Sequence, residues 1–198
     1  MDELAHSAAI DPCEFRMKNL GVDRGQVTQK YRAVLELAAD KSGWGKALPK
    51  GGGRGIACYM FGQTCVAHVV EVWVDPEGSL KLQRIVSAVD CGLAVNPDSV
   101  RAQIESGVNY ALTPILSGEI TIKEGAVEQT NFHDYPVLRM TDAPDIDVHI
   151  VPQGKEPGDG VGEAGVPPVA PAVANAIFAA TRIRVRRLPV DPKLLRQS

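Results

Sequence analysis

The sequence predicts an α+β fold in which antiparallel or mixed sheets pack against helices. Helical periodicity comes first, paired strand patterns follow, and the last strongly patterned segment is again an apolar helix. Helices and strands therefore do not alternate as they do in a parallel β-α series. The 198 residues, 44% of them hydrophobic and 23% charged, suffice for an ordinary globular core, and the net charge of −3 gives no sign of nucleic-acid binding.

The first 50 residues are predicted to be helical. Residues 2–9 form a short helix, and Asp11 followed by Pro12 is typical of a second helix start. A longer amphipathic helix is predicted over residues 26–39. Its apolar residues recur at helical spacing: Val27, Tyr31, Val34, Leu35 and Ala38. The chain can accordingly be divided into a helical segment, 1–50, and an α+β segment, 51–198.

A glycine-rich run at residues 50–55 allows two interpretations. Its backbone N–H groups, with Lys50 and Arg54, could hold an anion. The run lacks the Gly-Lys-Ser/Thr order of a P-loop, however, so a structural connector is the favoured interpretation.

Several strands are predicted after this run. Residues 56–61 form one, and residues 65–74 and 80–89 flank a turn signal as an antiparallel hairpin. His68 in this hairpin is expected to be a half-buried strand residue rather than a ligand, because no second His stands at metal spacing.

Weaker patterns predict the remaining strands. Residues 119–122 and 127 onward indicate a second hairpin, residues 145–151 a further strand, and residues 183–188 a short edge strand with a basic face. His133 and Asp134 are adjacent, and neighbours in a strand point to opposite faces, so they are not expected to form a relay. Their segment is interpreted as a loop or strand end near a substrate channel.

A further helix is predicted from the cap sequence Asn96-Pro97-Asp98. Its apolar stripe consists of Val100, Ile104, Val108, Ala111, Leu112 and Ile115. Gln103 flanks this stripe, and on pattern alone it is an exposed helix amide.

The four cysteines, Cys13, Cys58, Cys65 and Cys91, form no C-x-x-C pair, so zinc or iron–sulfur ligation is not expected in this chain. They are interpreted as small buried hydrophobic residues. The pattern leaves open a bridge between Cys58 and Cys65 across a hairpin.

The run Asp159-Gly160-Val161-Gly162-Glu163-Ala164-Gly165-Val166-Pro167-Pro168 is predicted to be a loop, because three glycines in six residues disfavour helix and strand. The two prolines fit the start of a helix. Residues 169–180 contain no charge, so that helix is expected to be buried nearly all round. Glu163 is either a partly desolvated carboxylate that is suited to accept a proton, or a solvated residue of a tight turn.

Several short motifs of this chain follow one another in the same order as motifs near the C-terminus of one enzyme family. They are Asp11-Pro12, Val89-Asp90-Cys91-Gly92, Val95-Asn96-Pro97-Asp98, Arg101-Ala102-Gln103-Ile104-Glu105, Asn131-Phe132-His133-Asp134-Tyr135-Pro136, Gly160-Val161-Gly162-Glu163-Ala164-Gly165 and Arg186-Arg187-Leu188-Pro189. Through them the chain resembles the molybdopterin-binding large subunit of the molybdenum hydroxylases, the xanthine dehydrogenase and aldehyde oxidoreductase family. Within it, the isoquinoline oxidoreductase-like branch is the most similar. The resemblance runs over residues 2–189, whereas the family's large subunits are several times longer.

The resemblance implies that residues 1–198 are the C-terminal part of a molybdopterin-binding domain. The enzyme would hydroxylate an N-heteroaromatic or aldehyde carbon with oxygen derived from water, with Glu163 as the base. The backbone at Gly160, Val161 and Gly162 would approach the cofactor, and Gln103 and Asn96 would contact it. No side chain would ligate the metal, which the pterin dithiolene holds. Many members have proline after this Glu, so Ala164 is expected to loosen the loop.

The resemblance also implies a molybdenum–molybdopterin cofactor in the cytosine dinucleotide form, with iron–sulfur clusters on a separate small subunit. The N-terminal remainder of the large subunit would complete the cofactor site, so this chain alone is expected to be inactive. The surface that this partner covers predicts self-association as a homo-oligomer.

The sequence leaves the cellular location open and allows an alternative function. No apolar run reaches membrane-spanning length, and the acidic start Met1-Asp2-Glu3 is unlike a signal peptide, which leaves cytoplasmic and periplasmic locations open. A non-catalytic unit that uses the same scaffold for packing or for small-molecule binding is the alternative function.

Overall fold

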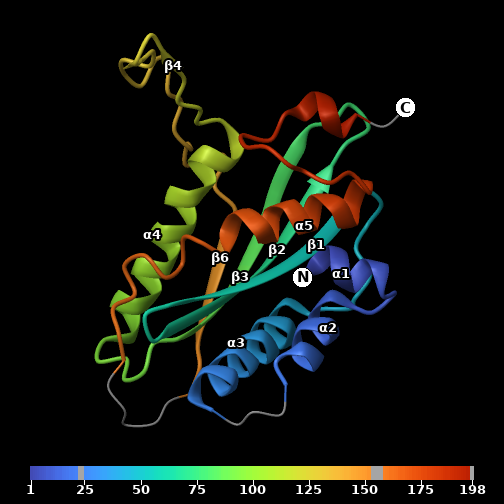
Figure 1. The fold of residues 1–198 in the computed structure, drawn as a ribbon, viewed down its shortest axis with the longest axis vertical. Coiled ribbons are helices and arrows are strands. Elements are labelled where there is room, and N and C mark those ends of the chain that lie inside the picture. Colours follow the sequence, from blue (N-terminus) through green and yellow to red (C-terminus); the bar gives the residue numbers. More distant parts are fainter. Residues whose placement is uncertain (22–24, 153–157, 197–198) are drawn as a thin grey trace.

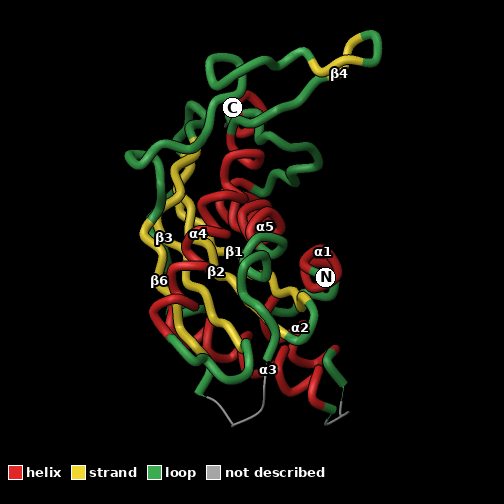
Figure 2. Tube along the Cα trace, turned by 90° about the vertical axis from the view of Figure 1, so that its left-hand side faces the viewer, coloured by secondary structure: helices red, strands yellow, loops and turns green. Residues whose placement is uncertain are grey.

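The computed structural model describes residues 1–21, 25–152 and 158–196, and its centre is a four-stranded sheet with helices on both faces (Figures 1 and 2). The elements are α1 (Asp2–Ser7), α2 (Pro12–Asn19), α3 (Gln26–Ser42), β1 (Gly52–Phe61), β2 (Thr64–Val74), β3 (Leu80–Asp90), α4 (Pro97–Leu116), β4 (Ile122–Lys123), β5 (Ala126–Val127), β6 (Asp145–Ile150), α5 (Val169–Thr181) and a 3-10 helix, Pro192–Leu195. Among the described helices, none is long and apolar enough to cross a lipid bilayer.

The strand order is β1-β2-β3-β6. β1 with β2 and β2 with β3 are antiparallel, whereas β6 runs parallel to β3. The sheet is therefore mixed, and the predicted α+β class is confirmed. The predicted hairpin over residues 65–74 and 80–89 is present as β2 and β3. The second hairpin is the short pair β4 and β5, which extends away from the body (Figure 1).

Both faces of the central strand β2 are buried. Val70, Val72 and Val74 belong to the core that β2 shares with α4 and α5. Cys65, Ala67 and Val69 belong to the core under α3. Because side chains alternate along a strand, a nearly continuous run of valines is what this doubly covered position requires.

The glycine run at residues 50–55 is not a connector, and that prediction is wrong. Gly52–Gly55 form the first part of β1 and pair with β2, so they build no anion cradle either. Gly53 and Gly55 lie directly under α5. A Cβ on Gly55 would lie 2.7 Å from the backbone carbon of Asn175, and one on Gly53 would lie 2.8 Å from Cβ of Ala180. The glycines therefore allow α5 to rest on the strand backbone.

The expectation that α5 is buried nearly all round is also wrong. Its buried residues lie on one side, which packs on β1 and β2, and they are Val169, Ala172, Val173, Ala176 and Ile177. Pro171 and Ala179 on the other side are exposed. α5 therefore lacks charged residues on its exposed side as well as on its buried side.

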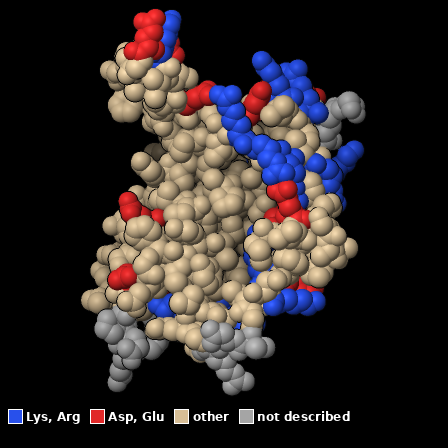
Figure 3. Space-filling model, in the orientation of Figure 1, with Lys and Arg blue, Asp and Glu red and all other residues tan. Residues whose placement is uncertain are grey.

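The predicted edge strand at residues 183–188 is wrong, because the segment after α5 has no strand partner in the described residues. Its arginines instead form ion pairs: Arg184 with Asp2 at 2.8 Å, Arg186 with Glu3 at 2.6 Å and Arg187 with Glu119 at 2.6 Å. Basic side chains accordingly gather beside acidic ones at the upper right of Figure 3. The arginines that gave this segment its alternating pattern bind carboxylates and do not mark an edge strand.

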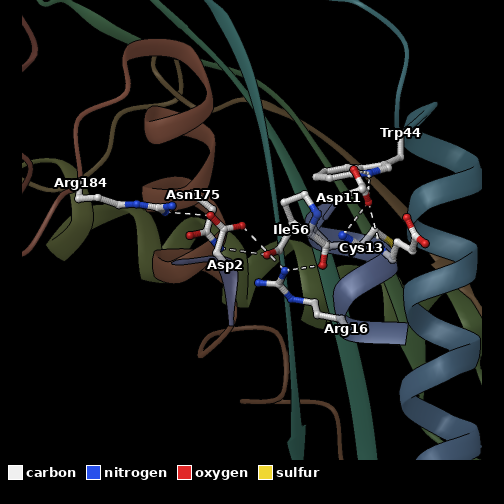
Figure 4. A network of polar contacts seen from close by, with 10 residues as sticks. Asp2, Asp11, Cys13, Arg16, Trp44, Ile56, Asn175 and Arg184 are labelled. Carbon is white, nitrogen blue, oxygen red and sulfur yellow. Dashed lines mark hydrogen bonds and ion pairs between the residues drawn. The ribbon is translucent and has the colours of Figure 1, made fainter. Parts of the chain in front are cut away.

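A polar network fastens α1 and α2 to the body (Figure 4). Asp2 lies between Arg184 at 2.8 Å and Arg16 at 3.8 Å. Asp11 caps α2 and also accepts a hydrogen bond from Nε1 of Trp44 at 2.9 Å. These contacts fix the helical N-terminal residues against the end of α5.

The segment around His133 forms turns rather than a strand. Nε2 of His133 therefore lies 3.6 Å from Oδ2 of Asp134, a proximity that strand alternation would exclude. Hydrogen bonds from the N–H groups of Asn131 and Thr130 lower the pKa of Asp134 to about 2. His133 is exposed, so the pair lies on the surface.

All four cysteines are free thiols. Cys13, Cys65 and Cys91 are buried as predicted, while Cys58 is half-buried. Burial raises the pKa of Cys13 to about 11 and also raises that of Cys65. Cys65 pairs across the β1–β2 ladder with Met60 rather than with Cys58, and no bridge forms.

Candidate functional site

The glycine loop, residues 158–168, leads into α5 and crosses α4 (Figure 1). A Cβ added to Gly107 of α4 would lie 3.4 Å from Cγ2 of Val166, and one added to Gly165 would lie 3.3 Å from the carbonyl oxygen of Ile104. Glycines on both partners thus let the loop pack against the helix backbone. This contact forms one wall of a cleft.

The cleft has a volume of about 500 Å³ and opens to solvent. It is lined by Phe61, Ser106, Gly107, Tyr110, Gly162, Glu163, Val166 and Pro167. Its walls come from the end of β1, from α4 and from the glycine loop. The middle of the face shown in Figure 3 carries few charged side chains.

Glu163 is exposed and lines the cleft, which agrees with the solvated turn residue among the two alternatives that the sequence leaves open. Its backbone is fixed all the same. The carbonyl of Glu163 accepts a hydrogen bond from the N–H of Val166 at 2.9 Å, which closes a turn. Ala164, within this turn, is 1% exposed and packs in a core cluster with Val66 and Ile104. Ala164 therefore anchors the loop directly after Glu163.

The start of the loop is tied to the β1–β2 turn. The N–H of Gln63 donates to Oδ2 of Asp159 at 2.7 Å. The hydroxyl of Thr64 lies 3.2 Å from the carbonyl oxygen of Asp159 and 3.1 Å from that of Gly160. Both anchors precede the exposed residues Gly162 and Glu163.

The end of the loop is tied to His68. Nε2 of His68 lies 2.8 Å from the carbonyl oxygen of Gly165, and Nδ1 lies 2.8 Å from Oγ of Ser87. His68 is fully buried, so the prediction of a half-buried residue is wrong. The error arises because β2 is covered on both faces. Burial lowers the pKa of His68 to about 4, despite the hydrogen bond to Gly165, which favours the charged form.

The low pKa of His68 predicts that the free energy of unfolding depends on pH. Its folded pKa of about 4 lies below the unfolded value of about 6.5, so its stabilising effect is complete above pH 6.5 and is lost as the pH falls toward 4. We expect the unfolding free energy of the wild type to fall by about 2 to 3 kcal/mol more than that of His68→Gln between pH 7 and pH 4.5. Urea unfolding of both proteins at the two pH values measures this difference, and equal losses would contradict the prediction.

Other charged groups lie away from His68. α5 carries none. The charged residues of α4 and of the loop are all exposed: Asp98, Arg101, Glu105, Asp159 and Glu163. The half-buried charged residues of the sheet form ion pairs: Arg54 with Glu71 at 2.7 Å, Arg84 with Asp147 at 2.9 Å, and Asp90 with Lys30 of α3 at 3.7 Å.

Of the remaining predicted site residues, Gly162 lines the cleft, whereas Asn96, Gln103, Gly160 and Val161 do not. Gly160 and Gly162 are exposed, and no atom lies within 4 Å of a Cβ added to either. Val161 packs partly against the core cluster of Ala164. Gln103 is exposed on α4, one turn before Gly107, and does not line the cleft. Asn96 caps α4, and its Oδ1 accepts from the N–H groups of Asp98 and Ser99 at 3.1 Å each.

Four residues of the cleft were not predicted from the sequence. Ser106, Gly107 and Tyr110 belong to α4, and Phe61 lies at the end of β1. A signal existed for Tyr110, which is 74% exposed and stands seven residues after Gln103, on the same side of the helix. Nothing local indicated Phe61. In the described residues, no group of three or more His, Cys, Asp or Glu side chains is placed to hold a metal ion.

Known proteins are similar to this chain in sequence. Residues 4–144 match the model of a molybdopterin cofactor-binding domain. The chain is 34% identical to a subunit of nicotinate dehydrogenase from Pseudomonas putida, over 99% of this chain and 18% of that protein. It is 33% identical to the beta subunit of isoquinoline 1-oxidoreductase from Brevundimonas diminuta, over 98% of this chain and 25% of that protein. The chain therefore spans a quarter or less of the length of these relatives.

The fold has solved counterparts. The aldehyde oxidoreductase of Desulfovibrio desulfuricans superposes with a TM-score of 0.57 at 26% identity, over 67% of this chain and 15% of that one. The predicted resemblance is confirmed by the matching family model, by relatives aligned over almost the whole chain and by this similarity in structure. The chain belongs to the molybdenum hydroxylase family and corresponds to part of its molybdopterin-binding region.

Proposed function

We propose that this chain is the C-terminal part of the catalytic subunit of a molybdenum hydroxylase, in which Glu163 is the base. The substrate is an N-heteroaromatic compound or an aldehyde. One observation carries the proposal: a carboxylate on a glycine loop, fixed by its backbone, lines an open cleft of about 500 Å³. A carboxylate that served only a tight turn would not need a loop anchored at both ends beside a cleft.

The predicted cofactor-binding residues on the glycine loop and on α4 fit a large ligand. The free space at Gly160 and Gly162 lets a ligand approach the loop backbone, where N–H groups are available as donors. Gln103 offers an exposed amide on α4. Asn96 uses its Oδ1 for the helix cap, which leaves its amide nitrogen as the group for a ligand. We assign these residues and Val161 to cofactor binding.

The molybdenum–molybdopterin cofactor, in the cytosine dinucleotide form, supplies the redox chemistry and activates water. The reaction converts a substrate C–H bond into C–OH and releases two protons and two electrons. Glu163 accepts one proton at its carboxylate, and the anchored turn keeps that carboxylate directed into the cleft. Cofactor and substrate in the cleft would displace water from around this carboxylate.

The proposal includes partners. The N-terminal remainder of the large subunit forms the other walls of the site, and a separate iron–sulfur subunit accepts the electrons. Both relatives are named as single subunits of larger enzymes, which supports an assembly of several chains. Exposed apolar residues such as Tyr110 and Phe61 support burial of this face by such a partner, and they favour self-association of the chain without it.

The source of the oxygen tests the reaction class. Intact enzyme that turns over nicotinate or isoquinoline in ¹⁸O-labelled water is expected to give a product with one labelled oxygen, measured by mass spectrometry. Unlabelled water with ¹⁸O₂ is the control. Label taken from dioxygen would exclude the proposed hydroxylation by water.

The isolated chain is expected to be inactive. Molybdenum and pterin analysis of the purified 198-residue chain should find far less than one cofactor per chain, with no turnover of the same substrates. Such a chain would lack the walls that enclose the cofactor. Stoichiometric cofactor with turnover would contradict this part of the proposal.

A further inference from the structure

We propose that His68, held by Ser87, is a positioning residue that fixes the glycine loop and so aims Glu163 into the cleft. The inference rests on the proposed role of Glu163 as the base. His68 itself does not reach the cleft, since it is fully buried in the sheet and is absent from the cleft lining. It acts through the backbone of the loop.

The loop depends on side chains for its position. In the described residues the loop pairs with no strand. Among these residues, His68 is the one whose side chain forms a hydrogen bond with the loop at a position after Glu163. The anchors at Gln63 and Thr64 hold only Asp159 and Gly160. Without the bond to Gly165, the turn that contains Glu163 would be held at its far end by packing alone.

The hydrogen-bond partners determine the tautomer of His68. The carbonyl of Gly165 can only accept, so Nε2 of His68 carries the hydrogen and donates to it. Nδ1 then accepts from the hydroxyl of Ser87. Ser87 is itself fully buried, so its hydroxyl has this one orientation to satisfy it. The chain Ser87–His68–Gly165 is a directed set of two hydrogen bonds.

This set acts close to the catalytic carboxylate. Gly165 is the third residue of the turn that the bond between Glu163 and Val166 closes. Ala164, between Glu163 and Gly165, is packed in the core. A shift of Gly165 therefore moves Glu163. Displacement of a catalytic group by about 1 Å costs about 10²-fold in rate, so the effect on turnover should be large.

Three variants separate positioning from folding. His68→Met removes the donor and keeps an apolar side chain of similar length. His68→Gln keeps an N–H donor near the place of Nε2 and serves as the rescue variant. Ser87→Ala leaves His68 in place and removes the group that orients it, so it is available if His68→Met does not fold.

Two measurements are made on each intact protein. Amide hydrogen exchange of the peptide covering Gly165 and Val166 reports the loop, with residues of α3 as internal reference. The kcat per bound molybdenum, with KM and cofactor content, reports catalysis. We expect His68→Met to speed loop exchange at least 10-fold and to lower kcat about 10²-fold with KM within about twofold, as expected for a displacement of about 1 Å. His68→Gln should restore both, and Ser87→Ala should lie between.

The outcomes are distinguishable. Unchanged loop exchange in His68→Met and Ser87→Ala would overturn the positioning role, whatever Glu163 does. Faster loop exchange with unchanged kcat per molybdenum would overturn the link to catalysis. An equal loss in His68→Gln would overturn the assignment to the Nε2 hydrogen bond. Failure of the proposed function is seen separately, as turnover that persists when Glu163 itself is replaced while the loop measurements stay as predicted.

Discussion

Replacing Glu163 by glutamine is expected to lower kcat per bound molybdenum by about 10² to 10⁴-fold, the usual contribution of a general base. Glutamine has nearly the same shape but cannot take a proton. Because Glu163 is exposed and its backbone makes the turn contact, the substitution should leave stability and cofactor content unchanged. The loss should therefore appear in kcat rather than in KM.

The matched control is Glu77→Gln, since Glu77 is an exposed residue of the turn between β2 and β3. It tests the general effect of losing one negative charge. Turnover within a few-fold of wild type in Glu163→Gln, with the cofactor retained, would exclude Glu163 as the base. A loss of the same size in both variants would assign the effect to charge rather than to proton transfer.

The largest expected effect on stability comes from Gly55→Ala, which should lower the unfolding free energy by about 3 kcal/mol, the upper part of the range for overpacked cores. The added Cβ meets the backbone of α5 at Ala172, Asn175 and Ala176, rather than a side chain that could turn away. Relief requires α5 to move off β1, which opens the core on that face. Chemical denaturation of both proteins measures the difference.

Gly162→Ala is the matched control, because its Cβ would meet no atom within 4 Å. Its stability should lie within about 0.5 kcal/mol of wild type or slightly above, since alanine restricts the unfolded chain. If the two variants have equal stability, the close packing of α5 on β1 is wrong. Loss of cofactor from Gly162→Ala alone would further support close approach of the cofactor to the loop.

Elements with strong local patterns could be predicted from the sequence. The hairpin of β2 and β3 has a turn signal between alternating strands, and α4 has an Asn cap and a regular apolar stripe. The family could also be predicted, because several motifs occur in the expected order. The comparisons confirm it.

Features that depend on distant residues could not be predicted. The glycines at 53 and 55 look like a flexible connector until α5, more than 100 residues later, is placed on them. The hydrogen bond from His68 joins residues 97 apart. The arginines after α5 resemble one face of a strand, yet their partners Asp2 and Glu3 lie at the other end of the chain.

The candidate site likewise combines features that follow from local sequence with features that depend on distant residues. The loop at Glu163 and its helix could be predicted from glycine and proline alone. Its anchors, the cleft wall at Phe61 and Tyr110, and the exposure of the carboxylate follow from packing between segments. Whether Gln103, Asn96, Gly160, Val161 and Gly162 bind the cofactor stays a prediction.

The most direct test is an experimental structure of the intact protein with its cofactor bound. We expect the cofactor in the cleft between α4 and the glycine loop, with the carboxylate of Glu163 within hydrogen-bond reach, about 2.6 to 3.2 Å, of the oxygen that is to attack the substrate. A cofactor bound on another face of this chain, or a Glu163 carboxylate turned out of the cleft into solvent, would contradict the account.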